Sequence, residues 1–481
     1  MIQEHVEKTK NGKIDIKEYV SKAIAETKEI NKEYNYMNII SEEEALKQAD
    51  ELSKKILNHD KPKLAGLIVS VKDNICIKDI ESTAGSAILK GYYPRFDATV
   101  IKRLKDAGAI ILGKTSMDEF GFGGFNLNVG LGFKIPLNPL DKERCTGGSS
   151  GGSGGITAKA DFAHVSIAES TGGSIETPAS FCGVVGFCPT YGRLSRFGLI
   201  SYANSLDKIG ILAKETSDIE PVLRVMSGKD SLDPTSIAQP LESEQDADQA
   251  AKSSFKIGII KESLDQSTAP EVKEALDRAI GRLKEAGHTV DVVSMPITFK
   301  YGVPTYYLIA TSEASTNLSK YSGLRYGQQH DPKGKTFSEY FKSIRTKYFN
   351  DESKRRIILG TFARMAGYRE AFYIRATKIR TLIINEYKKQ FSNYDALISP
   401  TMPILPPKIK EASSLTPIQN YMIDQLTVGP NLAGIPHASI PIGEHEGLSI
   451  GMMVMCPHYK EIKLLKILKL IESFQQKSAS R

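Results

Sequence analysis

Short apolar runs that alternate with helical segments constrain the fold of this chain more than any other feature. Two strand–helix–strand units are expected. In the first, strands at 64–71 and 109–112 enclose a helix at 97–108. In the second, strands at 255–260 and 288–295 enclose a helix at 269–286. Strands separated by helices of this length indicate βαβ units, in which helices cover a sheet. We therefore expect an α/β fold with a central mixed, largely parallel sheet covered by helices on both faces.

The same patterns divide the chain into segments. Residues 1–60 are expected to form an N-terminal helical segment, 61–475 a single domain and 476–481 a tail. The polar stretch at 227–254 is rich in helix and strand breakers and predicts an exposed excursion from that domain. After a strand expected at 395–400, a helix–strand–helix pattern completes the chain.

Composition and charge narrow the class of protein. Of 481 residues, 41% are hydrophobic and 25% are charged, as in ordinary globular proteins. The formal net charge of +7 is spread along the chain, so it permits contact with a nucleic acid without predicting it. Five cysteines without a CxxC pair argue against a disulfide framework or a zinc site. With no apolar membrane span or secretory signal visible, we expect a cytoplasmic protein without membrane contact.

Two familiar motif patterns match the sequence without the structural context that their chemistry needs. GAIILGKT at 108–115 satisfies the phosphate-loop pattern, but its centre is expected to be a buried strand and not a loop. GGSSG at 147–151 fits the nucleophile elbow, but a polar, turn-like segment precedes it where a strand is required. The histidines are scattered, without HExxH or a Cys/His cluster, so we expect no metal site.

Three short segments look specialised for chemistry. In IVSVKDNI, Lys72 follows an apolar strand. It is either an ordinary lysine whose stem lies on apolar surface or a buried amine that accepts a proton because burial makes its charged form costly. The glycine-rich segments CTGGSSGGSGG (145–155) and ESTGGSIETPASFCGVVGF (169–187) are each compatible with a tight turn. Interleaved β-branched and aromatic residues argue against a flexible linker.

Taken together, VKDNI, GGSSGGS, TGGSI and CGVVGFCPTYGRLSRFGL resemble the amidase signature family across its diagnostic region. Further blocks, among them SYANSLDKIG, RRIILGTFARMAGYREAFYIRATKIRTLI and NLAGIPHASIPIG, resemble the glutaminase subunits of tRNA-dependent amidotransferases, a branch of that family. The resemblance extends over residues 15 to 475 and implies the amidase signature fold.

The resemblance implies a Ser-Ser-Lys triad. Ser174, in TGGSI, matches the nucleophile that attacks the side-chain amide of glutamine and becomes a glutamyl ester. Ser149, the first serine of GGSSGGS, matches the bridging serine, and Lys72 matches the base at the end of the proton relay. The chemistry is consistent, because a serine hydroxyl is a poor nucleophile until a neighbour removes its proton. The spacing to the nucleophile, counted alone, would make Ser150 the bridge.

The residues around the nucleophile agree with the family pattern only in part. Thr171, Gly172 and Gly173 offer backbone N–H groups that can stabilise a tetrahedral oxyanion. Ser170 stands where the family usually has Asp, and Glu176 stands where it usually has Arg. These two departures affect the support of the nucleophile more than the triad itself.

The resemblance implies that the head group of glutamine is bound by Tyr306, Arg356 and Asp424. Arg356 would bind the α-carboxylate through two hydrogen bonds, and Asp424 would pair with the α-ammonium. Tyr307 and Arg355 are the alternatives if the match is shifted by one residue.

The resemblance implies a subunit that hydrolyses glutamine and passes ammonia to a partner, which amidates misacylated Glu-tRNA(Gln) or Asp-tRNA(Asn). A GatB-like subunit would hold the tRNA and use ATP and Mg²⁺, and a GatC-like subunit would complete a heterotrimer. This chain would need no cofactor of its own. A free-standing amidase that cleaves small amides is the alternative, while a non-catalytic binding module is disfavoured because all three triad positions are present.

Overall fold

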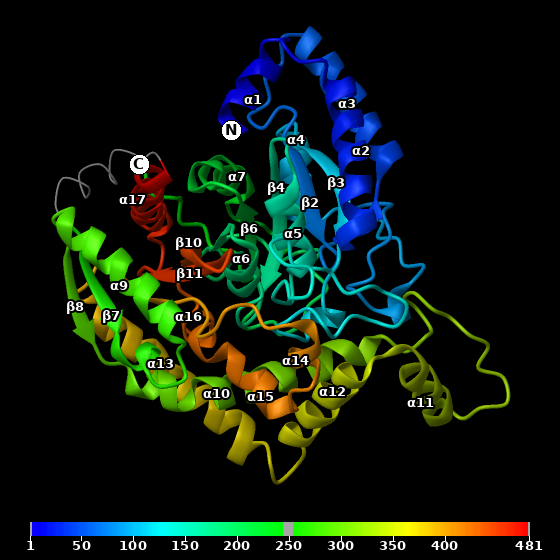
Figure 1. The fold of residues 1–481 in the computed structure, drawn as a ribbon. Helices are drawn as coiled ribbons and strands as arrows, with labels where there is room; N and C mark the ends of the chain where they lie inside the picture. The colour runs from blue at the N-terminus through cyan, green and yellow to red at the C-terminus, as the bar shows by residue number, and fades with distance from the viewer. Residues whose placement is uncertain (1, 244–253, 480–481) are drawn as a thin grey trace.

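One sheet organises the computed structural model, which describes residues 2–243 and 254–479 (Figure 1). Its eleven strands lie in the order β1-β3-β2-β4-β6-β5-β10-β11-β9-β7-β8 within this part of the chain. The strands are β1 (Met37–Ile40), β2 (Ile68–Lys72), β3 (Ile110–Thr115), β4 (His164–Ser170), β5 (Val185–Cys188), β6 (Lys208–Ala213), β7 (Lys256–Ile260), β8 (Thr289–Val293), β9 (Ala396–Pro400), β10 (His437–His445) and β11 (Leu448–Met455).

Helices lie on both sides of this sheet, as predicted. The α-helices are α1 (Ile2–Lys10), α2 (Ile16–Tyr34), α3 (Glu42–Leu57), α4 (Thr99–Asp106), α5 (Gly151–Lys159), α6 (Glu176–Cys182), α7 (Ile219–Met226), α9 (Pro270–Glu285), α10 (Pro296–Asn317), α11 (Phe337–Tyr348), α12 (Asp351–Arg364), α13 (Arg375–Phe391), α14 (Ile409–Ser413), α15 (Pro417–Met422), α16 (Val428–Ala433) and α17 (Glu461–Ala479). Within the described ranges, no helix combines the length and apolar character that a membrane span requires.

The sheet is mixed, as predicted, but it is not largely parallel. Pairing is parallel at β3–β2–β4 and at β9–β7–β8. The five pairs from β4 to β9 and the edge pair β1–β3 are antiparallel. Near the C-terminus the single predicted strand is a hairpin, in which Glu446 and Gly447 adopt positive φ and reverse the chain between β10 and β11. Parallel βαβ units therefore flank an antiparallel centre.

The predicted βαβ units are present with nearly the predicted bounds. The helix predicted at 269–286 is α9, and the strand predicted at 255–260 is β7. The segment predicted as helical at 1–60 also contains β1, which pairs with β3 and joins this segment to the sheet. Residues 244–253 of the predicted excursion and 480–481 of the predicted tail lie outside the described residues.

One face of β2 packs in the hydrophobic core, and the other faces the candidate site. Side chains alternate along a strand, so Val69 and Val71 point into the core formed with α4 and α7. Ser70 and Lys72 point to the opposite face, where Lys72 meets the loop that enters α5. The apolar face anchors the strand, and the other face presents its last residue to the site.

Candidate active site

The candidate site lies where two parallel neighbours, β2 and β4, end at the same edge of the sheet. Lys72 is the last residue of β2, and Glu169 is the penultimate residue of β4. Ser149 comes from the loop before α5, and Ser174 from the loop between β4 and α6. The fold therefore brings segments that are distant in the sequence to one edge.

Lys72 is fully buried, and its Nζ has three hydrogen-bond partners. Nζ lies 2.8 Å from Ser149 Oγ, 2.8 Å from the Glu169 carbonyl oxygen and 3.0 Å from Glu169 Oε2. The neighbouring Ser150 instead donates its hydroxyl to the Glu169 carbonyl oxygen at 3.2 Å. The serine that contacts the amine is therefore Ser149, as the motif indicates, and not Ser150, as the spacing would suggest.

Ser174 is the most accessible of the predicted triad, with 7% of its surface exposed while Ser149 and Lys72 have none. Within the described residues its hydroxyl makes no hydrogen bond, so the two serines are not joined directly. Hydrogen bonds between catalytic groups commonly tighten only when substrate binds. The geometry thus pairs Lys72 with Ser149 and leaves Ser174 open to a substrate.

The glycines before Ser174 are held by close packing. A Cβ on Gly172 would lie 2.4 Å from the ring of Tyr306, so only glycine fits beneath that ring. The Gly173 N–H donates to Ser170 Oγ at 3.2 Å and is already engaged. The Gly172 N–H makes no hydrogen bond within the described residues. Among the predicted oxyanion donors, Gly172 is therefore better placed than Gly173.

Glu169 belongs to the site, although no motif in the sequence assigns it there. Its Oε2 accepts hydrogen bonds from Lys72 and, at 3.0 Å, from Asn74 Nδ2. Its Oε1 accepts one from Thr171 Oγ1 at 2.6 Å, and the same hydroxyl lies 2.9 Å from Asp207 Oδ1. Burial and the nearby charge of Glu169 raise the pKa of Asp207 well above its usual range. The only sequence signal for Glu169 is its place at the end of a buried strand.

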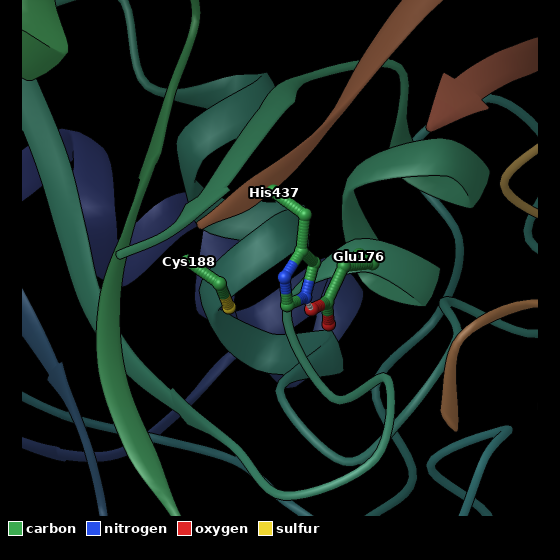
Figure 2. Close-up of side chains that lie close together, drawn as sticks. All are labelled: Glu176, Cys188 and His437. Carbon is green, nitrogen blue, oxygen red and sulfur yellow. Dashed lines mark hydrogen bonds and ion pairs between the residues drawn. The ribbon is translucent and has the colours of Figure 1, made fainter. Parts of the chain in front are cut away.

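The two departures from the family pattern meet in one buried network. Ser170 Oγ donates to Glu176 Oε2 at 2.8 Å, and the Ile175 N–H donates to the same oxygen at 3.1 Å. Glu176 Oε1 contacts His437 Nε2 at the start of β10, as Figure 2 shows. Glu176 thus holds the loop that contains Ser174 through Ser170, on one side of the nucleophile, and Ile175, on the other.

Two basic side chains, His437 and Lys208, lie close to Glu176, and burial together with Lys208 lowers the pKa of His437. Burial acts to raise the pKa of Glu176, but His437 and Lys208 outweigh it and hold that pKa below its usual range. Burial also lowers the pKa of Lys208, whose Nζ has no hydrogen-bond partner within the described residues.

The fold also assembles a group of potential metal ligands that the scattered histidines do not predict. The ligand atoms of Glu176, Cys188 and His437 lie within 4.8 Å of one another (Figure 2). A metal ion there would face the Lys208 cation and would have to separate Glu176 from His437. We therefore interpret the group as a hydrogen-bonded charge network.

A cavity of about 340 Å³ contains the predicted carboxylate-binding arginine in its wall. Arg356 is 3% exposed and lies among the rings of Phe122, Tyr202, Tyr307 and Tyr421, at 5.1, 5.7, 5.2 and 5.4 Å from their centroids. Its Nε donates to Glu352 Oε1 at 2.7 Å, and one terminal nitrogen donates to the Tyr202 hydroxyl at 2.7 Å. The other terminal nitrogen has no partner in the described ranges and is available to a carboxylate.

Asp424 and Tyr307 meet beside this cavity. The Tyr307 hydroxyl donates to Asp424 Oδ2 at 2.6 Å. Burial raises the pKa of Asp424 to about 6, against the opposing effects of Tyr307 and Arg356. Tyr306 packs on Gly172 and is not among the residues that line the cavity. Arg356, Asp424 and Tyr307 therefore form one group, whereas Tyr306 borders the nucleophile loop.

Glu352 is a further residue of the cavity that no sequence pattern indicates. Its carboxylate contacts both Arg355 and Arg356 and accepts a hydrogen bond from the Tyr421 hydroxyl at 3.0 Å. Arg355, the alternative to Arg356, has 41% of its side chain exposed. The buried arginine is thus the better candidate for binding a substrate inside the cavity.

This arrangement of side chains is suited to one class of chemistry. A buried amine in contact with a serine hydroxyl, beside an accessible serine flanked by glycine N–H groups, is suited to acyl transfer through a serine ester. A cavity lined by a buried arginine and a carboxylate is suited to a substrate that carries both charges.

The comparisons identify the family. The Amidase family model matches residues 18–465, and the chain belongs to this family. The A subunit of a glutamyl-tRNA(Gln) amidotransferase from Clostridium acetobutylicum is 44% identical, over 92% of this chain and 91% of that protein.

Solved structures agree with this assignment. A crystal structure of the A subunit of a glutamyl-tRNA(Gln) amidotransferase from Thermotoga maritima is similar with a TM-score of 0.77 and 31% identity, covering 95% of this chain and 91% of that one. A structure from a vestigial protein complex connected with the origins of an s-triazine catabolic enzyme has a TM-score of 0.84 and 28% identity, covering 98% of both chains. The predicted amidase signature fold is confirmed.

Proposed function

We propose that this chain is the glutaminase subunit of an aminoacyl-tRNA amidotransferase. The observation that carries the proposal is the 44% identity to the A subunit of such an amidotransferase over nearly the whole of both chains. The contact between Lys72 and Ser149 supports the same function. So does the charged cavity, which is lined by Tyr307, the residue after the Tyr306 that packs on Gly172. The names of the relatives favour Glu-tRNA(Gln) as the acceptor.

In this proposal Ser174 attacks the side-chain amide of glutamine. The Ser174 proton passes through Ser149 to Lys72, and the ester that forms is hydrolysed by water. Arg356 binds the α-carboxylate and Asp424 the α-ammonium of the substrate. Removing the proton as the bond forms lowers the barrier, because a neutral hydroxyl is a weak nucleophile.

The ammonia passes to a GatB-like partner, which holds the misacylated tRNA and uses ATP and Mg²⁺, and a GatC-like subunit completes the heterotrimer. The multi-subunit assembly follows from the kind of protein that the relatives are, and the identities of the two partners are part of the proposal. This chain itself contributes the glutaminase site and no cofactor.

The test is co-purification with candidate B and C subunits from the same source, followed by glutamine-dependent transamidation of Glu-tRNA(Gln) and Asp-tRNA(Asn). We expect a stable complex that converts Glu-tRNA only when glutamine and ATP are present. The same complex with Ser174→Ala should use free ammonia but not glutamine. Failure of the wild-type complex to transamidate either tRNA would refute the proposal.

A free-standing amidase is the second candidate. A solved structure described as an amidase favours it, with a TM-score of 0.81 and 25% identity over 98% of this chain and 99% of that one. The two functions differ in their need for partners. An amidase cleaves small amides alone, whereas the glutaminase subunit should do little without its partner subunits.

A further inference from the structure

The surroundings of Lys72 are those of a protonated amine. Its Nζ has three oxygen partners, which are Ser149 Oγ, the Glu169 carbonyl oxygen and Glu169 Oε2. An ammonium group has three N–H donors, one for each of these oxygens. A neutral amine has only two, and it uses its lone pair to accept the Ser149 proton. The relay needs that neutral form, so one proton must leave Lys72 before it can act as a base.

Glu169 is held as a carboxylate by its own partners. It accepts hydrogen bonds from Lys72 and Asn74 on one oxygen and from Thr171 on the other. Hydrogen bonds donated to a carboxylate favour its ionised form. The Lys72–Glu169 ion pair is fully buried, with exposures of 0% and 1%, so solvent does not screen the attraction.

Two other titratable groups face this pair. Asp207, the residue before β6, lies 2.9 Å from the Thr171 hydroxyl, and burial with the charge of Glu169 raises its pKa. Asp118, after β3, is fully buried and influenced by Lys72, and burial raises its pKa to about 6. Glu169 is the only one of the three carboxylates in direct contact with Lys72 within the described residues.

We propose that Glu169 is a positioning residue that holds the resting proton on Lys72 and so sets the pH range in which the serine relay works. The inference deepens the proposed function, because it takes Ser174 as the nucleophile.

The proton steps balance as follows. In the form that acts as a base, Lys72 has given one N–H proton to solvent and is an amine beside the Glu169 carboxylate. During attack the Ser174 oxygen bonds to the acyl carbon, its proton moves to Ser149 Oγ, and the Ser149 proton moves to Lys72 Nζ. The ammonium that forms is paired again with Glu169, and it returns its proton through Ser149 to the amide nitrogen. The C–N bond then breaks, so that ammonia leaves and the Ser174 ester remains.

The test compares pH profiles of wild type, Glu169→Asp and Glu169→Gln. The first readout is the rate at which a fluorophosphonate labels Ser174, in the chain alone and in the complex. The second is glutamine hydrolysis by the complex. In each profile the rate rises with pH over what we call the ascending limb. Because an opposite charge stabilises the ammonium, we expect this ascending limb to move to lower pH by about one unit or more in Glu169→Gln. Glu169→Asp, with a shorter reach, should move it less.

Two controls separate this role from a structural one. Ser174→Ala should not be labelled, and Glu119→Gln removes another buried carboxylate whose partners include Ser86 and Ser353. The Glu119→Gln limb should coincide with that of wild type. Equal loss of rate at every pH in both Glu169 variants would overturn the proposal, and so would a shift to higher pH.

Failure of the inference and failure of the proposed function give different results. Normal labelling with the expected shifts, but no glutamine hydrolysis in the complex, would refute the amidotransferase function and retain the role of Glu169. If the complex hydrolyses glutamine but the ascending limb of the pH profile is unchanged in both Glu169 variants, the amidotransferase function is retained and the role of Glu169 is refuted. Absence of labelling and hydrolysis in the wild type would overturn both.

Discussion

At the scale of single residues, the chemistry depends on which of two adjacent serines contacts the buried amine. Ser149 Oγ lies 2.8 Å from Lys72 Nζ, while the Ser150 hydroxyl donates to a backbone carbonyl oxygen. We expect Ser149→Ala to lower glutamine hydrolysis by roughly 10² to 10⁴-fold, the usual contribution of acid–base catalysis. Ser150→Ala should retain most of the activity. Steady-state assays of the complex measure both, and the reverse ranking would transfer the bridging role to Ser150.

The buried arginine of the cavity gives a second prediction at this scale. Arg356 lies among four aromatic rings and shares two N–H groups with Glu352 and Tyr202, so a lysine cannot reproduce its planar contacts. Arg356→Lys should raise KM for glutamine by about tenfold or more with a smaller change in kcat, because the α-carboxylate is bound equally before and during reaction.

The adjacent arginine provides the matched control for this measurement. Arg355→Lys changes a half-exposed side chain and should leave KM nearly unchanged. If Arg355→Lys raised KM while Arg356→Lys did not, the substrate would be bound by the other arginine.

At the scale of elements, β4 carries a histidine that limits stability in acid. His164 opens this strand and is buried, with its Nε2 bonded to Ser70 Oγ at 2.6 Å and its Nδ1 without a partner among the described residues. Burial, with a smaller effect of Lys214, lowers the pKa of His164 to about 3. Between about pH 6.5 and pH 3, His164 is therefore protonated in the unfolded chain but neutral in the folded chain. The free energy of unfolding falls as pH drops through this range.

The effect is measurable by urea unfolding between pH 7 and pH 5. For this one proton, stability should fall by up to about 1.4 kcal/mol per pH unit in wild type. His164→Gln should remove that part of the slope, whereas His445→Gln, at an exposed position, should not. Equal slopes in all three proteins would contradict the assignment.

The element scale also shows what periodicity can predict. Apolar runs and helical spacing place β7 and α9 nearly to the residue, because burial of one face imposes a period on the sequence. The same reasoning merged β10 and β11 into one strand. Their two-residue turn, Glu446 and Gly447, follows the polar residues Glu444 and His445 and lacks the Asn-Gly or Asp-Gly pair that marks such hairpins.

At the scale of the whole molecule, the network around Glu176 joins α6 to β10. Glu176 and His437 are 261 residues apart, and both are fully buried. Glu176→Gln weakens this contact and leaves Lys208 without its balancing carboxylate. We expect a loss of about 3 kcal/mol in the free energy of unfolding, because the buried Lys208 then lacks an opposite charge.

Thermal and urea unfolding measure this loss. The matched control is Glu42→Gln, which removes an exposed contact with Lys28 and should cost at most about 1 kcal/mol. A Glu176→Gln protein as stable as wild type would show that the network does not hold α6 against β10.

Local periodicity and short motifs predict the α/β class, most helices and strands, and the positions of the triad in the chain. The folded chain is needed to show that Ser149 contacts Lys72, that Glu169 pairs with that amine, and that His437 contacts Glu176 below the nucleophile loop. Such contacts depend on the order of strands in the sheet and on which side chains share a face. Neither can be read from a pattern along one chain, since they follow from packing between segments far apart in it.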